Sequence, residues 1–139
     1  MNEFLVKNEE DTRAFGITLA ESLKASDVIG LIGDLGTGKT TLTKYIAEGL
    51  GIDETITSPT FTVVKEYNSG RLPLYHFDVY RLTSGNDLWE IGADDYLYGK
   101  GVSIVEWADL VKDGLPENTK FIYLEYGKGE NERIYKWDF

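Results

Sequence analysis

The sequence predicts an α/β protein in which helices flank a mixed central β-sheet. The first observation behind this prediction is a short apolar run at residues 28–32, followed by a glycine-rich segment and then by an apolar stripe of helical period. The second is a pair of stretches rich in β-branched and aromatic residues, 60–67 and 74–80, with a turn between them. The third is another apolar run at residues 102–105, which has the length of a buried strand.

The N-terminal part of the chain predicts a helix, a strand and a second helix. Either Asn8 or Thr12 caps the first helix, because acidic residues crowd its first turn. Residues 27–32 form the strand, and residues 39–50 form the second helix. One face of the first helix carries Phe15, Leu19 and Leu23, and one face of the second carries Leu42, Ile46 and Leu50.

The rest of the chain alternates short elements with turns. Residues 60–67 and 74–80 are expected to pair as a β-hairpin at about 60–80, around the turn at residues 68–70. Beyond the hairpin, the pattern predicts two short helical pieces within residues 86–97, a buried strand at 102–105, a helical turn at 108–111, and strands at 121–126 and 133–139.

The glycine-rich segment at residues 33–40 reads GDLGTGKT and matches the pattern G-x-x-x-x-G-K-[ST]. Its glycines let the backbone wrap closely around phosphates, and successive N–H groups then form an anion-binding concavity. Lys39 can reach the β- and γ-phosphates, and Thr40 offers a hydroxyl to Mg²⁺. The strand before the segment and the helix after it favour this interpretation over an ordinary glycine-rich turn. The expected fold is therefore a single P-loop NTPase-like domain over residues 1–139.

Composition excludes several classes of function. The chain has 139 residues and no cysteine, so disulfides and thiolate metal sites are excluded, which fits a reducing cytosol. Its net charge of −10 argues against stand-alone binding to DNA or RNA, whose phosphates repel an acidic surface. The N-terminal residues lack the pattern of a signal peptide, and no apolar run is long enough to span a membrane.

Two carboxylates are candidates to complete a phosphate site. Asp78 follows the moderately apolar strand of the hairpin, and Glu106 follows the cleaner run at residues 102–105. Ligands of open α/β sheets collect beyond the carboxyl ends of strands, so either residue could reach a Mg²⁺ ion held by Thr40. Trp107 is ambiguous between a core aromatic, a lid aromatic and a cover for the nucleotide. His76 shares a strand face with Asp78 and could bond to it, but a partly buried structural histidine is the preferred interpretation.

Four segments in this order resemble the TsaE family, also called YjeE, the small bacterial ATPase of tRNA threonylcarbamoyladenosine biosynthesis. They are GDLGTGKTT at 33–41, SPTFT at 58–62, YHFDVYR at 75–81 and VEW at 105–107. The glycine-rich segment alone is shared by many families, whereas the other three, in this order, are far more specific. The resemblance covers most of residues 8–110, and the chain beyond matches in general character.

The resemblance implies a set of site residues. It implies that Lys39, Asp78 and Glu106 are catalytic, with Asp78 supporting hydrolysis by ordering water, and that Thr40 and Glu106 hold Mg²⁺. Residues 58–60 would act as a switch segment near the γ-phosphate. Binding of ATP would involve Asp34, Leu35, Gly36, Thr37, Gly38, Lys39, Thr40 and Thr41 at the phosphates, Trp107 beside the nucleotide, and Thr12 and Arg133 on the side of the base or ribose.

The resemblance also implies partners. The family's ATPase works in an assembly with the TsaB–TsaD pair, which transfers threonylcarbamoyl to the adenosine next to the anticodon of tRNA. The expected activity is therefore a Mg²⁺-dependent ATPase, weak alone and stimulated by that pair, which resets or remodels the complex. The protein would be cytoplasmic and would meet tRNA only indirectly through the complex, without binding DNA or a membrane.

Two other functions remain open from the residues. A small-molecule kinase would share the glycine-rich segment, but it needs an acceptor pocket and usually an arginine-bearing lid. Only three arginines follow the segment, namely Arg71, Arg81 and Arg133. A non-catalytic, ATP-gated protein-binding switch would also fit, although no Asn-Lys-x-Asp segment points to guanine nucleotides.

Overall fold

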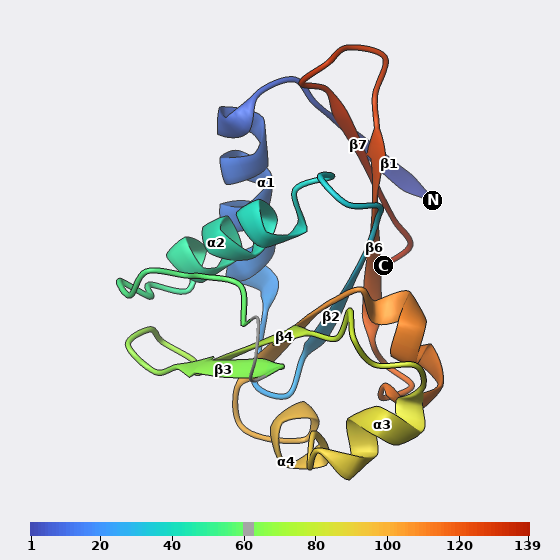
Figure 1. Cartoon of the computed structure of the whole chain (residues 1–139). Coiled ribbons are helices and arrows are strands. Elements are labelled where there is room, and N and C mark those ends of the chain that lie inside the picture. The colour runs from blue at the N-terminus through green and yellow to red at the C-terminus, as the bar shows by residue number, and fades with distance from the viewer. Residues whose placement is uncertain (60–62) are drawn as a thin grey trace.

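A mixed β-sheet runs through the middle of the protein (Figure 1). The computed structural model describes residues 1–59 and 63–139, and within them the sheet has seven strands in the order β1-β7-β6-β2-β5-β4-β3. The strands are β1 Asn2–Val6, β2 Val28–Ile32, β3 Val64–Tyr67, β4 Leu74–Asp78, β5 Val102–Glu106, β6 Lys120–Tyr126 and β7 Arg133–Trp137.

The centre of the sheet is parallel and its edges are antiparallel. Strand β2 pairs in parallel with β5 and β6, and β5 pairs in parallel with β4. The carboxyl ends of these strands therefore meet at one edge of the sheet, where ligands of α/β proteins bind. The register places Glu106 of β5 between Leu31 of β2 and Asp78 of β4.

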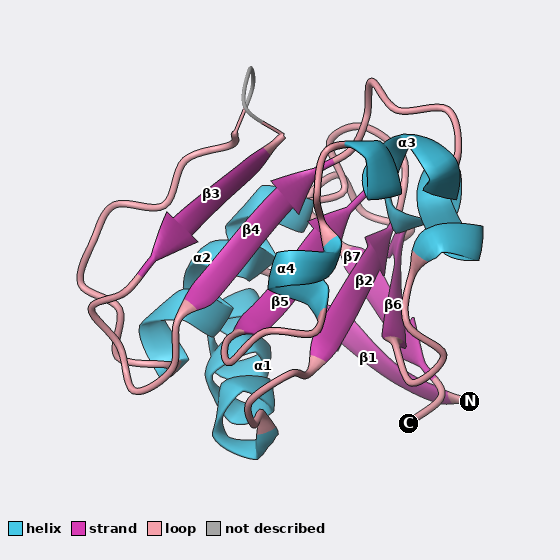
Figure 2. Ribbon diagram, turned by 90° about the horizontal axis from the view of Figure 1, so that it is seen from below, coloured by secondary structure: helices cyan, strands magenta, loops and turns pink. Residues whose placement is uncertain are grey.

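Helices cover both faces of the sheet (Figures 1 and 2). Helices α1 (Glu9–Ser22) and α2 (Lys39–Gly49) pack on one face, where they share an apolar cluster with alternate residues of the central strands. Helices α3 (Gly85–Glu90) and α4 (Asp94–Leu97) and the 3₁₀ segment η1 (Ala108–Gly114) enclose a second cluster. The predicted fold class, a mixed sheet flanked by helices, is confirmed.

The ends of the first two helices follow local chemistry. Asn8 caps α1, because its Oδ1 accepts a hydrogen bond of 3.0 Å from the backbone N–H of Asp11. Thr12, the other predicted cap, lies inside the helix instead. Helix α2 ends at Gly49, and Gly51 takes the left-handed backbone, with φ of 80°, that often follows a helix.

The predicted hairpin is confirmed, with shorter strands than expected. Strands β3 and β4 pair antiparallel. Strand β3 begins at Val64, because Val63 has a left-handed φ of 66° that is incompatible with a strand. The prediction for residues 60–62 lies outside the described residues. Strand β4 ends at Asp78 rather than residue 80, since Asp78 Oδ1 accepts a 3.1 Å bond from the backbone N–H of Tyr80 and turns the chain.

The later elements also match their predictions, and one strand was not predicted. The helical pieces α3 and α4 flank Gly92, whose φ is 77°. Strand β1 was missed because it is a five-residue edge strand whose partner, β7, lies at the other end of the chain. Among the described residues, none of the helices is long and apolar enough to cross a membrane.

Candidate nucleotide site

The glycine-rich loop connects β2 to α2 and needs its glycines. Gly36 and Gly38 have φ of 82° and 93°, in the left-handed region that side chains disfavour. At Gly33, a Cβ atom would stand 2.6 Å from the carbonyl oxygen of Leu124 and from Oγ1 of Thr37, too close for any other residue. Gly38 also precedes the first turn of α2, so the free N–H groups of that helix point into the loop. A helix N-terminus with this loop favours an anion.

Several side chains fix the shape of the loop by binding its carbonyl groups. Thr37 is buried, and its hydroxyl donates a 2.8 Å bond to the carbonyl of Asp34. Tyr126 of β6 donates from its hydroxyl to the carbonyl of Leu35. Arg133 of β7 donates from Nη2 to the carbonyl of Gly36 at 3.1 Å. These bonds occupy carbonyl groups of the loop, and the backbone N–H of Thr37 also donates within the loop, to the carbonyl of Asp34 at 3.2 Å.

Lys39 lies folded into the loop. Its Nζ donates to the carbonyls of Gly33 at 2.6 Å and Asp34 at 3.0 Å, and it stands 3.9 Å from the centre of the Trp107 ring. Burial lowers the pKa of the Lys39 ammonium group, and the nearby carboxylates of Glu106 and Asp78 oppose that change. The positive charge is therefore held within the loop, where phosphate oxygens would replace the carbonyls.

Thr40 and Glu106 are in direct contact. The Thr40 hydroxyl donates to Oε1 of Glu106 at 2.9 Å, with Oε2 at 3.0 Å, and the glutamate side chain is only 3% exposed. A hydroxyl that donates its proton keeps its lone pairs for a cation. Within residues 1–59 and 63–139, no group of three or more acidic, histidine or cysteine side chains is arranged to hold a metal ion. Mg²⁺ needs no such cluster, because it commonly takes one or two carboxylates together with substrate phosphates. The pair fits that pattern.

Asp78 sits beside this pair but has other partners. Its Oδ2 accepts a 3.0 Å bond from the Ser58 hydroxyl, and its Oδ1 accepts the N–H of Tyr80. A hollow of about 300 Å³ brings it together with the helix start. The lining residues are Leu35, Gly36, Gly38, Lys39, Thr40, Thr41, Ser58, Asp78, Glu106 and Trp107. The two carboxylates that the sequence could not tell apart therefore differ: Glu106 meets Thr40, and Asp78 meets Ser58.

His76 is more deeply buried than the preferred interpretation expected, and the alternative bond to Asp78 is not formed. The imidazole is fully buried, and its Nε2–H donates to Oε2 of Glu106. Residues two apart on one strand point the same way but stand about 7 Å apart, whereas a diagonal neighbour on the adjacent strand is within reach of long side chains. His76 opposes Ile104 in the register, which makes Glu106 that diagonal neighbour.

Trp107 belongs both to the core and to the site. Its backbone is left-handed, with φ of 63° and ψ of 35°, which turns the chain directly after β5. The ring packs against the second apolar cluster and lies 4.8 Å from the ring of Tyr80. Its other contact is Lys39, so the tryptophan borders the hollow as well. Tyr80, which is exposed, was not predicted at this position.

A second hollow, of about 510 Å³, lies on the other side of the loop. Its lining includes Thr12 and Arg133 together with Gly36, Gly38 and Thr41 of the loop and helix start. The Thr12 hydroxyl is 3.1 Å from the hydroxyl of Tyr135. The hollow also contains residues that sequence reasoning missed, namely Lys7, Asn8, Asn131 and Tyr135. No local pattern marks them, because three separate parts of the chain meet there.

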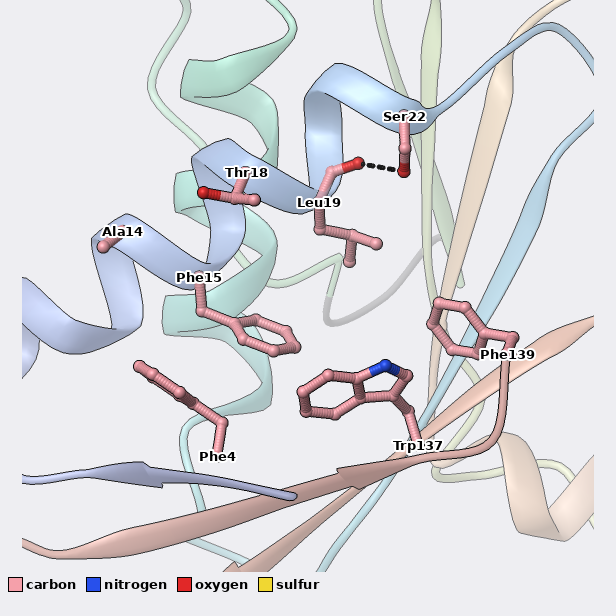
Figure 3. A pocket seen from close by; sticks show the side chains of 8 residues that line it. All are labelled: Phe4, Ala14, Phe15, Thr18, Leu19, Ser22, Trp137 and Phe139. Atoms are coloured by element: carbon pink, nitrogen blue, oxygen red, sulfur yellow. Dashed lines mark hydrogen bonds between the residues drawn. The ribbon is translucent and has the colours of Figure 1, made fainter. Parts of the chain in front are cut away.

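A further hollow of about 610 Å³ has a different character (Figure 3). It lies between α1 and the strands β1 and β7, and the rings of Phe4, Phe15, Trp137 and Phe139 turn toward it. None of the side chains that line it is titratable. It offers no charged side chain for a phosphate or a metal ion, so the loop is the stronger candidate for a nucleotide site.

The arrangement of sheet, glycine-rich loop and helix defines an α/β protein of the P-loop NTPase type. A family model narrows this class: "Threonylcarbamoyl adenosine biosynthesis protein TsaE" matches residues 6–135. The chain belongs to the TsaE family.

Individual relatives agree with this assignment. The chain is 48% identical over 126 residues to the tRNA threonylcarbamoyladenosine biosynthesis protein TsaE of Bacillus subtilis, covering 91% of this chain and 78% of the relative. It is 44% identical over 128 residues to the protein of the same name from Treponema pallidum, covering 92% and 94%. The crystal structure of Bacillus subtilis YdiB is similar with a TM-score of 0.84 and 43% identity, covering 98% of this chain and 83% of that one.

Proposed function

We propose that this protein is a Mg²⁺-dependent ATPase that serves as an accessory subunit in threonylcarbamoyl modification of the adenosine next to the anticodon of tRNA. The observation that carries the proposal is the hydrogen bond between Thr40 and Glu106 at the mouth of the glycine-rich loop. This bond joins the start of α2, which would bind phosphate, to a buried carboxylate that would bind Mg²⁺ together with Thr40. The membership in the TsaE family supplies the pathway.

The site residues divide into three roles in this proposal. The loop N–H groups and Lys39 bind the phosphates of ATP, and Mg²⁺ neutralises charge on them when bound. Thr40 and Glu106 hold that ion. Asp78 lies at the side of the hollow where Ser58 enters, and there it orients the attacking water. Thr12 and Arg133 contact the base or ribose.

The partner in this proposal is the TsaB–TsaD pair, and tRNA is met only through that complex. A net charge of −10 supports an indirect role toward RNA, because phosphate backbones repel an acidic surface. Turnover by the isolated protein is expected to be weak. A P-loop site without an arginine at the transferred phosphate is slow, and Arg133, which contacts the loop, is bonded to the carbonyl of Gly36. A cytoplasmic location remains a prediction.

The arrangement of two arginines weakens the kinase alternative. A kinase lid needs a guanidinium free to close over the transferred phosphate. Arg71 instead donates to the carbonyls of Ala20 and Leu23, at 2.6 and 2.9 Å, at the C-terminal end of α1. Arg133 is committed to the loop backbone. An ATP-gated switch without hydrolysis differs from the proposal only in turnover, so the experiment below separates them.

The test compares ATP hydrolysis by the protein alone and with its cognate TsaB–TsaD pair and tRNA. We expect stimulation of the wild type by the pair. Asp78→Asn should bind Mg²⁺–ATP but lose turnover, and Glu106→Gln should need more Mg²⁺ to bind the nucleotide. Asp109→Asn is the matched control, since it removes an exposed carboxylate near Lys39 that does not line the hollow.

Four results would contradict the proposal. If the cognate TsaB–TsaD pair did not raise turnover, the part of the proposal that names this pair as the partner would be refuted. Partner binding that depends on ATP but is accompanied by no turnover in the full assembly would favour the switch, whereas normal turnover in Asp78→Asn with loss of partner binding would make Asp78 an interface residue rather than a catalytic one. Phosphorylation of nucleosides, nucleotides or small alcohols at ordinary kinase rates would favour a kinase.

A further inference from the structure

A buried histidine on the neighbouring strand contacts the proposed metal ligand. His76 in β4 is 0% exposed, and its Nε2–H donates to Oε2 of Glu106 in β5. The two strands pair in parallel, and His76 lies opposite Ile104, two residues before Glu106. Leu74 and Ile104, which point to the same face, belong to the apolar cluster under α1 and α2. The contact is therefore shielded from water by core side chains.

Two donors share the carboxylate of Glu106. Oε1 accepts from the Thr40 hydroxyl at 2.9 Å, and Oε2 accepts from His76, with the same hydroxyl at 3.0 Å. A glutamate side chain has three rotatable bonds, so one contact does not fix its direction. Without His76, the one donor left to the carboxylate among the described residues would be the Thr40 hydroxyl, which a metal ion would also approach. With His76, Oε2 is held and Oε1 stays directed at Thr40.

The histidine makes this bond at a cost that packing alone does not explain. Its other nitrogen, Nδ1, is buried and has no hydrogen-bond partner among the residues that the structure describes. A buried polar atom without a partner is unfavourable, and such atoms in native proteins call for an explanation. A leucine or phenylalanine would fill this space without that cost. The bond from Nε2 to Glu106 is the contribution that an apolar residue could not supply.

We propose that His76 is a positioning residue of the Mg²⁺–ATP site, which holds Oε2 of Glu106 and thereby directs Oε1 toward Thr40 and the metal ion. The proposal rests on the function proposed above. His76 itself touches neither nucleotide nor metal, and it acts through Glu106. Residues that hold metal ligands in this way typically change metal affinity or activity by about 10–100-fold when replaced.

The first test measures the Mg²⁺ concentration that half-saturates nucleotide binding, together with binding in EDTA. His76→Leu removes the donor, whereas His76→Gln keeps an N–H at a similar reach. We expect His76→Leu to raise the half-saturating Mg²⁺ concentration by about 10–100-fold and His76→Gln by less than about threefold. Binding in EDTA should not change. Phe77→Leu is the control, because it loosens the same strand on its other face and leaves His76 in place.

Two results of this test would overturn the proposal. One is a His76→Leu variant with the Mg²⁺ dependence of the wild type. The other is a Phe77→Leu variant with the same weakened dependence as His76→Leu, which would make the effect a matter of packing. If Mg²⁺ did not affect nucleotide binding by the wild type, the function proposed above would be refuted instead. The second test would then show whether the His76–Glu106 contact exists.

The second test needs no nucleotide. The chain has one histidine, so a ¹⁵N spectrum of the imidazole contains a single ring and needs no assignment. We expect the proton on Nε2, slow exchange with water, and a change in its chemical shift in Glu106→Gln, because an amide oxygen is a weaker acceptor than a carboxylate. A ring with a proton on Nδ1 and none on Nε2, or an Nε2–H signal that Glu106→Gln leaves unchanged, would refute the contact.

Discussion

Replacing Thr40 with valine should destabilise the protein and also remove its response to Mg²⁺. Valine keeps the branched shape of threonine but lacks the hydroxyl that donates to Glu106 at 2.9 Å. A hydrogen bond to a charged group contributes about 1.5–3 kcal/mol to the free energy of unfolding. Glu106 is 3% exposed, so water cannot readily replace the lost donor. For a chain of this length the loss corresponds to a melting temperature lower by roughly 5–9 °C.

The assay is thermal unfolding, followed by circular dichroism with and without a non-hydrolysable ATP analogue and Mg²⁺. A ligand present at a hundred times its dissociation constant raises the free energy of unfolding by about 2.7 kcal/mol. The wild type should show a gain of this order that depends on Mg²⁺. Thr40→Val should lose the part that depends on Mg²⁺, and Thr40→Ser should keep it. In a double-mutant cycle with Glu106→Gln, the two changes should not be additive, because they remove the same contact.

Thr43→Val is the matched control for this prediction. It makes the same substitution in the same helix, but the buried Thr43 hydroxyl donates to the backbone carbonyl of Lys39 rather than to a carboxylate. The stabilisation by Mg²⁺ should survive in this variant. A Thr40→Val protein as stable as the wild type, with its Mg²⁺-dependent stabilisation intact, would show that the hydroxyl neither holds Glu106 nor helps to bind the ion.

Three further changes test separate parts of the structure. Burial lowers the pKa of Lys39 in the folded protein from its ordinary value of 10.5. Between the folded and the unfolded pKa the unfolded chain binds more protons, so the free energy of unfolding rises with pH. Denaturant titrations at several alkaline pH values should show this rise in the wild type but not in Lys39→Met, and a rise that persists in the variant would point to another group. Tyr126→Phe removes the hydrogen bond to the carbonyl of Leu35, so calorimetric titration should show weaker ATP binding. The free energy of unfolding should change by about 1 kcal/mol or less, because the side chain is half exposed. An unchanged affinity would mean that the loop keeps its shape without this bond. Asn8→Ala removes the cap of α1 and should lower the free energy of unfolding in urea by about 1 kcal/mol, whereas Asn8→Asp should not; equal losses would argue against capping.

The elements that could be predicted from the sequence are those whose signals are local. The glycine-rich loop, the strand before it and the helix after it form one continuous pattern, and the hairpin of β3 and β4 closes around an Asn-Ser-Gly turn. Strand β1 has no such signal. Only its pairing with β7, in which Asn2 lies opposite Trp137, makes it a strand, and that partner is not visible in a short window of sequence.

The same distinction separates the parts of the site. Residues 33–40 were identified by spacing alone, but spacing could not divide the roles of Asp78 and Glu106. Sheet order separates their positions, because β5 lies next to β2 and carries Glu106 to the start of α2, while β4 is one strand further away. The partner of His76 depends on register in the same way. Strand alternation predicted its face correctly but could not reveal the neighbouring strand.

The charges around the loop make Mg²⁺ necessary in the proposed function. They also predict that Glu106→Gln changes ATP affinity in opposite directions with and without Mg²⁺, which a purely structural Glu106 would not show. Lys39 already faces the carboxylates of Glu106 and Asp78, and ATP would add phosphate charge beside them. Two like charges about 5 Å apart repel by about 3 kcal/mol at an effective dielectric constant near 20. Without Mg²⁺, Glu106→Gln should therefore bind ATP more tightly than the wild type, because one repulsion is gone. With Mg²⁺ it should bind more weakly, since a ligand of the ion is gone. Calorimetric titration in EDTA and in Mg²⁺ measures both, and a variant that is weaker under both conditions would mean that Glu106 supports the loop rather than the ion.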